Sequence, residues 1–144
     1  MKKIILAAFM AACGLQMSAQ QNLFVAQDLE SAIVNKDNTV TFNFKAPDAQ
    51  KVQIAGDFAE KAEGQHIGGM VGAGLIDMTK NSEGIWTYTT KPLDSELYSY
   101  EFMVDGVPTI DPNNVYVYRD FATTSNVFIV GNGKADLYKV NKVC

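Results

Sequence analysis

The feature that most constrains this fold is a two-residue alternation of apolar and polar side chains. Residues 40–45 read Val-Thr-Phe-Asn-Phe-Lys, and residues 97–104 carry an aromatic or apolar side chain at every second position. A period of two places successive side chains on opposite faces of a strand, whereas a helix requires a period near 3.6. No segment of useful length has the helical period. The sequence therefore predicts an all-β protein.

Turn-forming residues separate the predicted strands. Asn35–Asn38, Asp105-Gly106 and Asp111–Asn114 each follow an apolar segment, and such Asn, Asp, Gly and Pro clusters favour tight turns. We expect strands at 31–34, 40–45, 52–55, 85–90, 97–104, 107–110, 115–118 and 126–130. Six to eight short strands with these turns indicate an antiparallel β-sandwich.

The side chains on the apolar faces of these strands form the predicted core. We expect the core to contain Phe42, Phe44, Val52, Ile54, Trp86, Tyr88, Tyr100, Phe102, Val104, Val127 and Ile129. The segment after Gly56 differs, because five of the eleven glycines lie between residues 64 and 74. Glycine loses more backbone entropy on ordering than other residues, so we predict a long, mobile loop there.

The N-terminus resembles a secretory signal. Lys2 and Lys3 precede an unbroken apolar run at 4–12, which is shorter than the ~20 residues needed to cross a bilayer. Cleavage after Ala19 is favoured, and a lipoprotein-type cleavage that leaves a lipid on Cys13 is the alternative. We therefore expect a periplasmic or secreted protein, or in the alternative a lipid-anchored one.

The domain boundaries follow from these patterns. We expect a signal peptide at 1–19, a polar spacer at 20–30, one folded domain at 31–131 and a truncated linker at 132–144. Cys13 lies in the signal and Cys144 is the last residue, so the predicted domain has no internal disulfide.

Charge argues against a nucleic-acid partner. Removal of residues 1–19 takes away Lys2 and Lys3, which leaves ten basic residues against sixteen acidic ones and a net charge of −6. Arg119 is the only arginine, and the lysines are dispersed, whereas phosphate-binding surfaces cluster basic side chains. We also expect no transmembrane segment, because no later segment has a sufficiently long apolar run.

The sequence lacks the residue patterns of common catalytic and metal sites. No serine has G-x-S-x-G spacing, and the only histidine is His66 in the glycine-rich segment. Paired cysteines for zinc and the Lys-Ser or Lys-Thr ending of a phosphate-binding loop are also missing. Asp105, Asp111 and Asp120 are explained as turn residues. We expect no catalytic residue, no metal ligand and no cofactor in this chain.

Aromatic residues are the remaining candidates for function. A sugar ring stacks on an exposed flat side chain, and its hydroxyl groups need amide or carboxylate partners nearby. We select Trp86, Tyr116, Tyr118 and Asn126 as candidate carbohydrate-binding residues, and expect Tyr116, Tyr118 and Asn126 to be exposed. The alternative for Trp86 and its neighbouring rings is that they fill the core.

Six segments carry a resemblance to a known family. They are Asn38-Thr-Val-Thr-Phe-Asn-Phe-Lys-Ala-Pro47, Val52-Gln-Ile-Ala-Gly-Asp-Phe58, Gly84-Ile-Trp-Thr-Tyr88, Tyr98-Ser-Tyr-Glu-Phe-Met-Val-Asp-Gly106, Asp111-Pro-Asn-Asn114 and Ser125-Asn-Val-Phe-Ile-Val130. The chain resembles the early-set immunoglobulin-like domains related to carbohydrate-binding module family 48. Specifically, it is similar to the N-terminal accessory domain of secreted Bacteroidetes esterases of the feruloyl and acetyl-xylan type. The resemblance implies an immunoglobulin-like antiparallel β-sandwich.

The resemblance also sets functional expectations, with departures. Glycogen-binding members place a tryptophan, a lysine and a second tryptophan where this sequence has Lys61, Glu101 and Pro108, and only Asn126 agrees with their sugar site. In the esterases a separate catalytic domain follows, and this sequence does not contain it. We expect an exported, non-catalytic accessory module of a carbohydrate esterase or other glycan-degrading system, with weak binding to a plant or storage polysaccharide. The alternatives are a structural module that packs on a hydrolase domain, or an N-terminal fragment of a secreted esterase.

Overall fold

The structure is a computed structural model that describes residues 29–67 and 70–138. The predicted signal peptide, Cys13, nearly all of the predicted spacer and Cys144 lie outside the described residues. Within the described ranges every β-sheet pairing is antiparallel and no α-helix occurs. The predicted all-β class and the immunoglobulin-like sandwich are confirmed.

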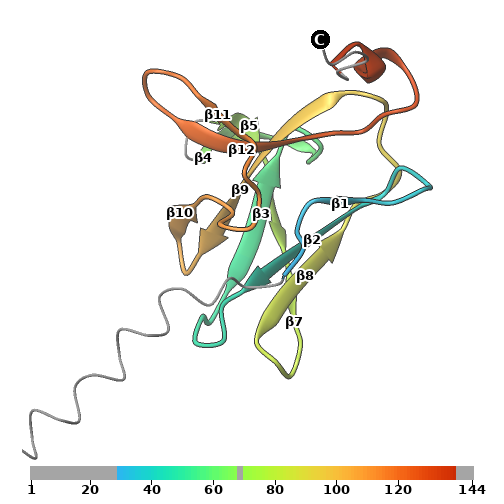
Figure 1. Cartoon of the computed structure of the whole chain (residues 1–144). Coiled ribbons are helices and arrows are strands. Elements are labelled where there is room, and N and C mark those ends of the chain that lie inside the picture. The colour runs from blue at the N-terminus through green and yellow to red at the C-terminus, as the bar shows by residue number, and fades with distance from the viewer. Residues whose placement is uncertain (1–28, 68–69, 139–144) are drawn as a thin grey trace, which may run out of the picture.

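One sheet has four strands in the order β1-β2-β8-β7 (Figure 1). Its members are β1 (Ile33–Val34), β2 (Val40–Lys45), β8 (Ile85–Thr89) and β7 (Thr79–Lys80). The Asn/Asp-rich turn after β1 closes the predicted hairpin, with Val34 opposite Val40. Asn38 at its end has a positive φ of 62°, which asparagine tolerates better than most residues.

The second sheet follows the order β11-β12-β9-β3-β6, and β10 also pairs with β9. Its members are β11 (Val117–Arg119), β12 (Thr124–Ile129), β9 (Leu97–Val104), β3 (Val52–Gly56), β6 (Leu75–Asp77) and β10 (Val107–Thr109). Figure 1 shows the β11–β12 hairpin projecting from the body of the sandwich. Asp105-Gly106 forms the predicted turn between β9 and β10, with φ of 47° and 85°.

The prediction of a mobile glycine-rich loop is wrong for most of its length. Strands β4 (Lys61–Ile67) and β5 (Met70–Ala73) pair with each other as a separate two-stranded sheet, and β6 follows directly. Glycine lowers strand propensity without preventing backbone pairing. The described residues therefore form twelve short strands, where the sequence predicted six to eight.

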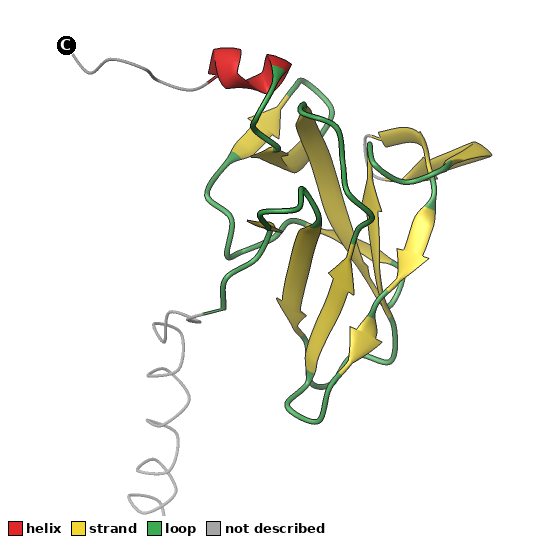
Figure 2. Ribbon diagram, turned by 90° about the vertical axis from the view of Figure 1, so that its right-hand side faces the viewer, coloured by secondary structure: helices red, strands yellow, loops and turns green. Residues whose placement is uncertain are grey.

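The core lies between the two main sheets, whose facing strands are visible in Figure 2. Of the eleven predicted core residues, seven are buried and Tyr88 and Val104 are half-buried against them. The buried seven are Phe42, Phe44, Val52, Ile54, Trp86, Tyr100 and Phe102. Their rings pack closely, with centroids 4.8 Å apart for Phe42 and Tyr100 and 4.6 Å apart for Phe44 and Phe102. Such contacts favour a single packed arrangement.

The predicted inward face of the last strand is wrong. Phe128 and Val130 are buried, whereas Val127 is half-buried and Ile129 is 36% exposed. The ring of Phe128 lies 5.5 Å from that of Phe42. Because both faces of this strand carry apolar side chains, the alternation alone did not determine which face turns inward.

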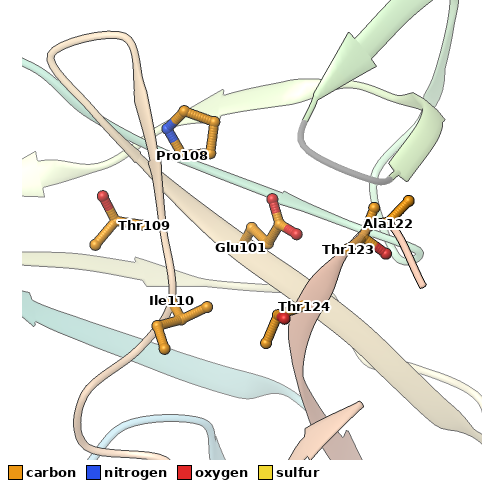
Figure 3. Close-up of a pocket in the computed structure, with 7 residues that line it drawn as sticks. All are labelled: Glu101, Pro108, Thr109, Ile110, Ala122, Thr123 and Thr124. Atoms are coloured by element: carbon orange, nitrogen blue, oxygen red, sulfur yellow. The ribbon is translucent and has the colours of Figure 1, made fainter. Parts of the chain in front are cut away.

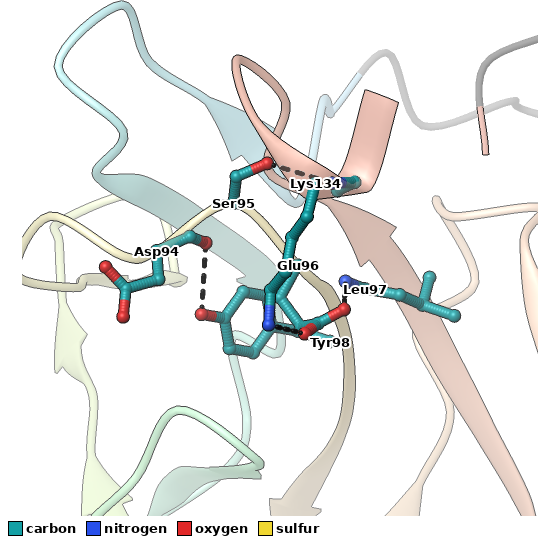
Figure 4. Close-up of polar contacts among 7 residues, drawn as sticks. Asp94, Ser95, Glu96, Leu97, Tyr98 and Lys134 are labelled. Atoms are coloured by element: carbon teal, nitrogen blue, oxygen red, sulfur yellow. Dashed lines mark hydrogen bonds and ion pairs between the residues drawn. The ribbon is translucent and has the colours of Figure 1, made fainter. Parts of the chain in front are cut away.

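The chain continues to pack on the sandwich beyond the predicted boundary at residue 131. A 3-10 helix at Lys134–Tyr138 buries Ala135 completely. Figure 4 shows its contacts with the segment that leads into β9: Lys134 forms an ion pair with Glu96, and Ser95 Oγ accepts a hydrogen bond from the Ala135 amide at 3.1 Å. The described part of the predicted linker is therefore folded against the domain.

Candidate functional site

Trp86, one of the four predicted site residues, lies in the core. Its side chain is 7% exposed, and its indole Nε1 donates a hydrogen bond to the Ala46 carbonyl at 2.9 Å. Lys80 Nζ lies over the ring, 5.4 Å from its centroid. The alternative of a core tryptophan is the one observed, and no ring face is open for a sugar.

Asn126 is completely buried, so the prediction that it is exposed is wrong. Its Oδ1 accepts a hydrogen bond from the Asp111 amide at 2.6 Å, and its Nδ2 donates to the carbonyls of Asp111 and Asn114. A buried amide side chain must satisfy its donors and its acceptor. These bonds fix Asn126 as the structural support of the 111–114 turn, with no atom directed at solvent.

The same turn is held by the hydroxyl group of Tyr100. This hydroxyl donates to Asp111 Oδ2 at 2.8 Å and accepts from Asn114 Nδ2 at 3.0 Å. Burial raises the pKa of Tyr100, and the neighbouring Asp111 carboxylate raises it further. The network therefore holds the turn that leads into β11, and it depends on a neutral Tyr100.

Two of the three predicted turn aspartates cap their own turns. Asp111 Oδ1 accepts from the Asn113 amide, and Asp120 Oδ1 accepts from the amides of Ala122 and Thr123. Asp105 instead accepts from the amides of Gln50 and Lys51, more than fifty residues away. All three carboxylates therefore have structural partners.

Tyr116 and Tyr118, the other two predicted site residues, are exposed as expected. They are 70% and 60% exposed, and they lie on the β11 side of the β11–β12 hairpin. The Asp120 turn closes this hairpin, and the backbone amides of Ala122 and Thr123 lower the pKa of Asp120. The hairpin therefore presents two accessible rings on a hydrogen-bonded support.

Two hollows adjoin these rings. The Tyr116 hollow, about 420 Å³, is lined by Ser31, Ala32, Val34, Leu97, Asn113, Asn114, Val115, Tyr116, Val127, Phe128 and Ile129. The Tyr118 hollow, about 310 Å³, is lined by Asp57, Leu97, Tyr98, Ser99, Val117, Tyr118 and Val127. Leu97 and Val127 line both, so the two hollows are neighbours.

The polar wall of the Tyr118 hollow is built from Asp57 and Ser99. Asp57 Oδ2 accepts hydrogen bonds from the Ser99 amide at 2.9 Å and the Ser99 hydroxyl at 2.6 Å. Sequence reasoning did not select either residue, since Asp57 reads as the turn residue after β3. Only the pairing of β3 with β9 brings the two side chains together.

A third hollow, of about 280 Å³, lies further along β9. Figure 3 shows Glu101 between the segment at 108–110 and the segment at 122–124, and these residues line the hollow. Glu101 is 4% exposed, and its Oε1 accepts a hydrogen bond from Ser125 Oγ at 2.9 Å. We call this the Glu101 hollow; its lining also includes Thr109, Thr123 and Thr124.

The structure brings together two of the positions at which the sequence departs from the glycogen-binding members. Glu101 and Pro108 both line the Glu101 hollow, where those members place a lysine and a tryptophan. The third position, residue 61, falls in β4. The predicted site residues with accessible rings, Tyr116 and Tyr118, lie instead just before and on β11.

The surface formed by the three hollows and the rings of Tyr116 and Tyr118 combines aromatic and apolar side chains with hydroxyl, amide and carboxylate groups. Such a surface can stack a sugar ring and exchange hydrogen bonds with its hydroxyl groups. Within the described residues, no group of three or more His, Cys, Asp or Glu side chains is placed to hold a metal ion. None of the helices in the same ranges is long and apolar enough to span a bilayer.

Known proteins share the fold of this chain at low sequence identity. No protein-family model matches the chain, and neither does any curated protein. Among solved structures, the chain is similar to the pullulanase SAP of Group B Streptococcus in complex with maltotetraose, with 16% identity and a TM-score of 0.51. A second crystal structure of a Group B Streptococcus pullulanase SAP matches with 15% identity and a TM-score of 0.51.

Both matches cover 74% of this chain and 15% of the pullulanase chain. The chain therefore spans a small part of the length of the enzymes it resembles. At these identities the likeness shows a shared fold: this β-sandwich also occurs as part of a pullulanase.

Proposed function

We propose that this chain is a non-catalytic module that binds a polysaccharide as an accessory to a glycan-degrading enzyme. The observation that carries the proposal is the pair of exposed rings, Tyr116 and Tyr118, beside hollows with hydroxyl and carboxylate groups. The shared fold with part of a pullulanase supports the same assignment. The interior positions of Trp86 and Asn126 support moving the proposed site to β11.

The chemistry of the face favours a neutral glycan. Asp57 contributes a carboxylate to the Tyr118 hollow and Glu101 contributes one to the Glu101 hollow, and the whole chain carries a net charge of −4. These charges would repel a uronic-acid polymer. Starch-type glucans are natural first probes because a pullulanase of the same fold was solved with maltotetraose. Xylans follow from the sequence resemblance to esterase domains.

The enzyme context and the cell location are part of the proposal. The six sequence segments that resemble esterase N-terminal domains support a carbohydrate esterase as the partner, whereas the fold comparison supports a glycoside hydrolase. We propose that the protein is exported, on the strength of Lys2, Lys3 and the apolar run that follows them.

Affinity electrophoresis tests the binding function. The purified protein is run through native gels that contain soluble starch, arabinoxylan or pectin, beside a gel without polysaccharide. We expect retardation by starch or arabinoxylan and none by pectin. Unchanged mobility in all polysaccharide gels would contradict the binding proposal.

Substitutions on the hairpin test the location of the site. Each Tyr→Ala change at 116 or 118 removes a stacking surface worth about 1 kcal/mol, or roughly fivefold in Kd. Phe121→Ala is the matched control, because Phe121 is a fully exposed aromatic residue of the same hairpin that lines none of the three hollows. Equal effects of all three substitutions would place the binding elsewhere.

A second candidate is a structural module that packs on a hydrolase domain without binding a glycan. The apolar exposure of the β11 hairpin favours it, since Val115 and Phe121 are almost entirely open to solvent. Analytical ultracentrifugation with a purified pullulanase or esterase catalytic domain separates the two candidates. Complex formation that Phe121→Ala abolishes, without retardation by any polysaccharide, would favour the structural module.

A further inference from the structure

Strand β11 is the last strand of the second sheet, and among the described residues only β12 pairs with it. Together with the two residues before it, the strand reads Val115-Tyr116-Val117-Tyr118-Arg119. All five residues are exposed, and the exposed fractions of the first four lie between 46% and 83%. A row of apolar side chains on an open sheet edge favours pairing with a further strand.

The backbone of this segment points alternately toward β12 and away from it. The Tyr116 carbonyl accepts a hydrogen bond from the Val127 amide at 3.0 Å, so Tyr116 is a position that faces β12. In antiparallel pairing the next residue turns its N–H and C=O groups the other way. Val117 and, two residues later, Arg119 therefore offer two donors and two acceptors to a strand on the open side.

The other outer strands of the two main sheets have features that discourage pairing. β10 contains Pro108, which has no N–H to donate, and β7 contains Lys80. In β6, Asp77 forms an ion pair with Lys51 at 3.2 Å, and β1 is only two residues long. Proline, charged side chains and short length are the usual protections of a sheet edge. The segment 115–118 contains neither proline nor a charged residue.

The segment 115–119 is complementary to a second copy of itself. With Val117 on a two-fold axis, Val117 faces its own counterpart and Val115 faces Arg119, and any other register shortens the overlap. The same register places Tyr116 beside Tyr118 of the second copy at a position without hydrogen bonds, where Cα atoms are about 4.5 Å apart. Aromatic pairs across neighbouring strands stabilise a sheet. The symmetric arrangement contains two such tyrosine pairs.

The charge of the hairpin permits two copies to approach. Residues 115–123 contain one basic and one acidic residue, Arg119 and Asp120, whereas the whole chain carries a net charge of −4. Molecules of like charge repel each other, so contact is favoured where the surface is neutral. The hairpin projects from the body of the sandwich (Figure 1), which leaves room for a second sandwich beyond the β11 edge.

We propose that two copies of this chain pair antiparallel through β11 and join their second sheets into one continuous sheet. The inference goes beyond the proposed function and does not rest on it. One strand pair buries less than a standard interface of about 1,200–2,000 Å², so we expect a reversible dimer with a Kd of roughly 10–100 μM. A two-fold axis perpendicular to the sheet keeps Tyr116 and Tyr118 of both copies on one face.

Sedimentation equilibrium of the purified protein tests the dimer. Runs from about 5 to 500 μM span the expected Kd. A reducing agent is present so that Cys144 cannot link two copies. We expect the average mass to rise with concentration from that of one chain toward that of two. The mass of one chain at every concentration would overturn the proposal.

Two substitutions at Val117 test the pairing through β11. Val117→Lys places two ammonium groups opposite each other at the two-fold axis, and Val117→Pro removes an outward N–H that makes no bond to β12. Each should raise the Kd at least tenfold. Val107→Lys is the matched control, because Val107 is a 62% exposed valine on the proline-containing β10. It should dimerise like the wild type, and thermal unfolding of each variant checks that the fold is retained.

The outcomes separate this inference from the proposed function. A dimer that survives both Val117 substitutions, or that Val107→Lys breaks, would overturn the pairing through β11. A protein that stays monomeric but is retarded by a polysaccharide would refute this inference alone. A dimer that no polysaccharide retards would refute the proposed function alone.

Discussion

At the scale of single residues, burial distinguishes the polar side chains that support the fold from those that solvent can reach. Asn126 on β12 is completely buried, whereas Asn114 in the preceding turn is half-buried, and the amide groups of both side chains are hydrogen-bonded within the fold. A sequence does not reveal this difference, because asparagine is usually exposed. The backbone amide and carbonyl groups that Asn126 bonds belong to residues 12 and 15 positions away.

Asn126→Asp tests the supporting role of this residue. The change removes both Nδ2 donors and places a carboxylate against the carbonyls of Asp111 and Asn114. We expect a loss of about 3 kcal/mol or more of unfolding free energy at neutral pH. Chemical denaturation measures it, with Asn43→Asp on partly exposed β2 as the control. Similar unfolding free energies for the two variants would contradict the assignment.

Tyr100 makes the fold sensitive to alkaline pH. Its pKa is raised in the folded state, so folding favours the protonated hydroxyl. This contribution is complete below the unfolded value near 10 and is lost as pH rises above it. We expect the melting temperature to fall steeply above pH 10, and Tyr100→Phe to lower it at pH 7 but to flatten the alkaline decline. Tyr116→Phe should keep the wild-type slope; an unchanged slope in Tyr100→Phe would refute the role.

At the scale of elements, the alternation of apolar and polar residues predicted where most strands lie, but it did not always predict which face of a strand points into the core. Strand β9 occupies the predicted residues, and β2, β3 and β8 differ from the prediction by no more than one residue at an end. Strand β12 carries apolar residues on both faces, so its orientation follows from the packing of Phe128 against Phe42 and Tyr98. Strands β4 to β7 were not predicted, because they are short, glycine-rich or without clear alternation.

Paired substitutions on β12 test its orientation. Phe128→Ala removes a buried ring and should cost about 3–5 kcal/mol of unfolding free energy. Ile129→Ala changes a side chain that is already partly exposed and should cost about 1 kcal/mol. Denaturant unfolding of both variants provides the comparison. A larger loss for Ile129→Ala would show that the strand faces the other way.

Two turn glycines offer a test of local geometry. Gly84 and Gly106 have φ of 76° and 85°, but a Cβ on Gly84 would meet Pro47 at 2.6 Å, while a Cβ on Gly106 would meet nothing within 4 Å. Gly106→Ala should cost about 1 kcal/mol from the backbone alone. Gly84→Ala should cost clearly more, because the Pro47 backbone must also move. Equal melting temperatures for Gly84→Ala and Gly106→Ala would contradict the close approach of Pro47 to Gly84 in the turn before β8.

At the scale of the whole molecule, the face that we propose to bind a glycan is brought together by the order of the strands in the second sheet. The turn after β3, the start of β9 and the β11–β12 hairpin are distant in sequence, and the order β11-β12-β9-β3 places Asp57, Ser99 and Tyr118 around one hollow. Sequence reasoning identified Tyr116 and Tyr118 as exposed rings, since they follow a turn outside the main apolar pattern. It did not find their partners, because no local pattern encodes sheet order.

The most direct test of the account is a ¹⁵N NMR titration of the wild-type protein with maltohexaose and, separately, xylohexaose. The account predicts that one of these ligands shifts the backbone amides of residues 97–101, 115–118 and 124–129. It also predicts that the indole N–H of Trp86, which bonds the Ala46 carbonyl, stays unchanged. Shifts centred on Trp86 and β8, with none on β11, would contradict the central claim that the glycan binds the β11 face.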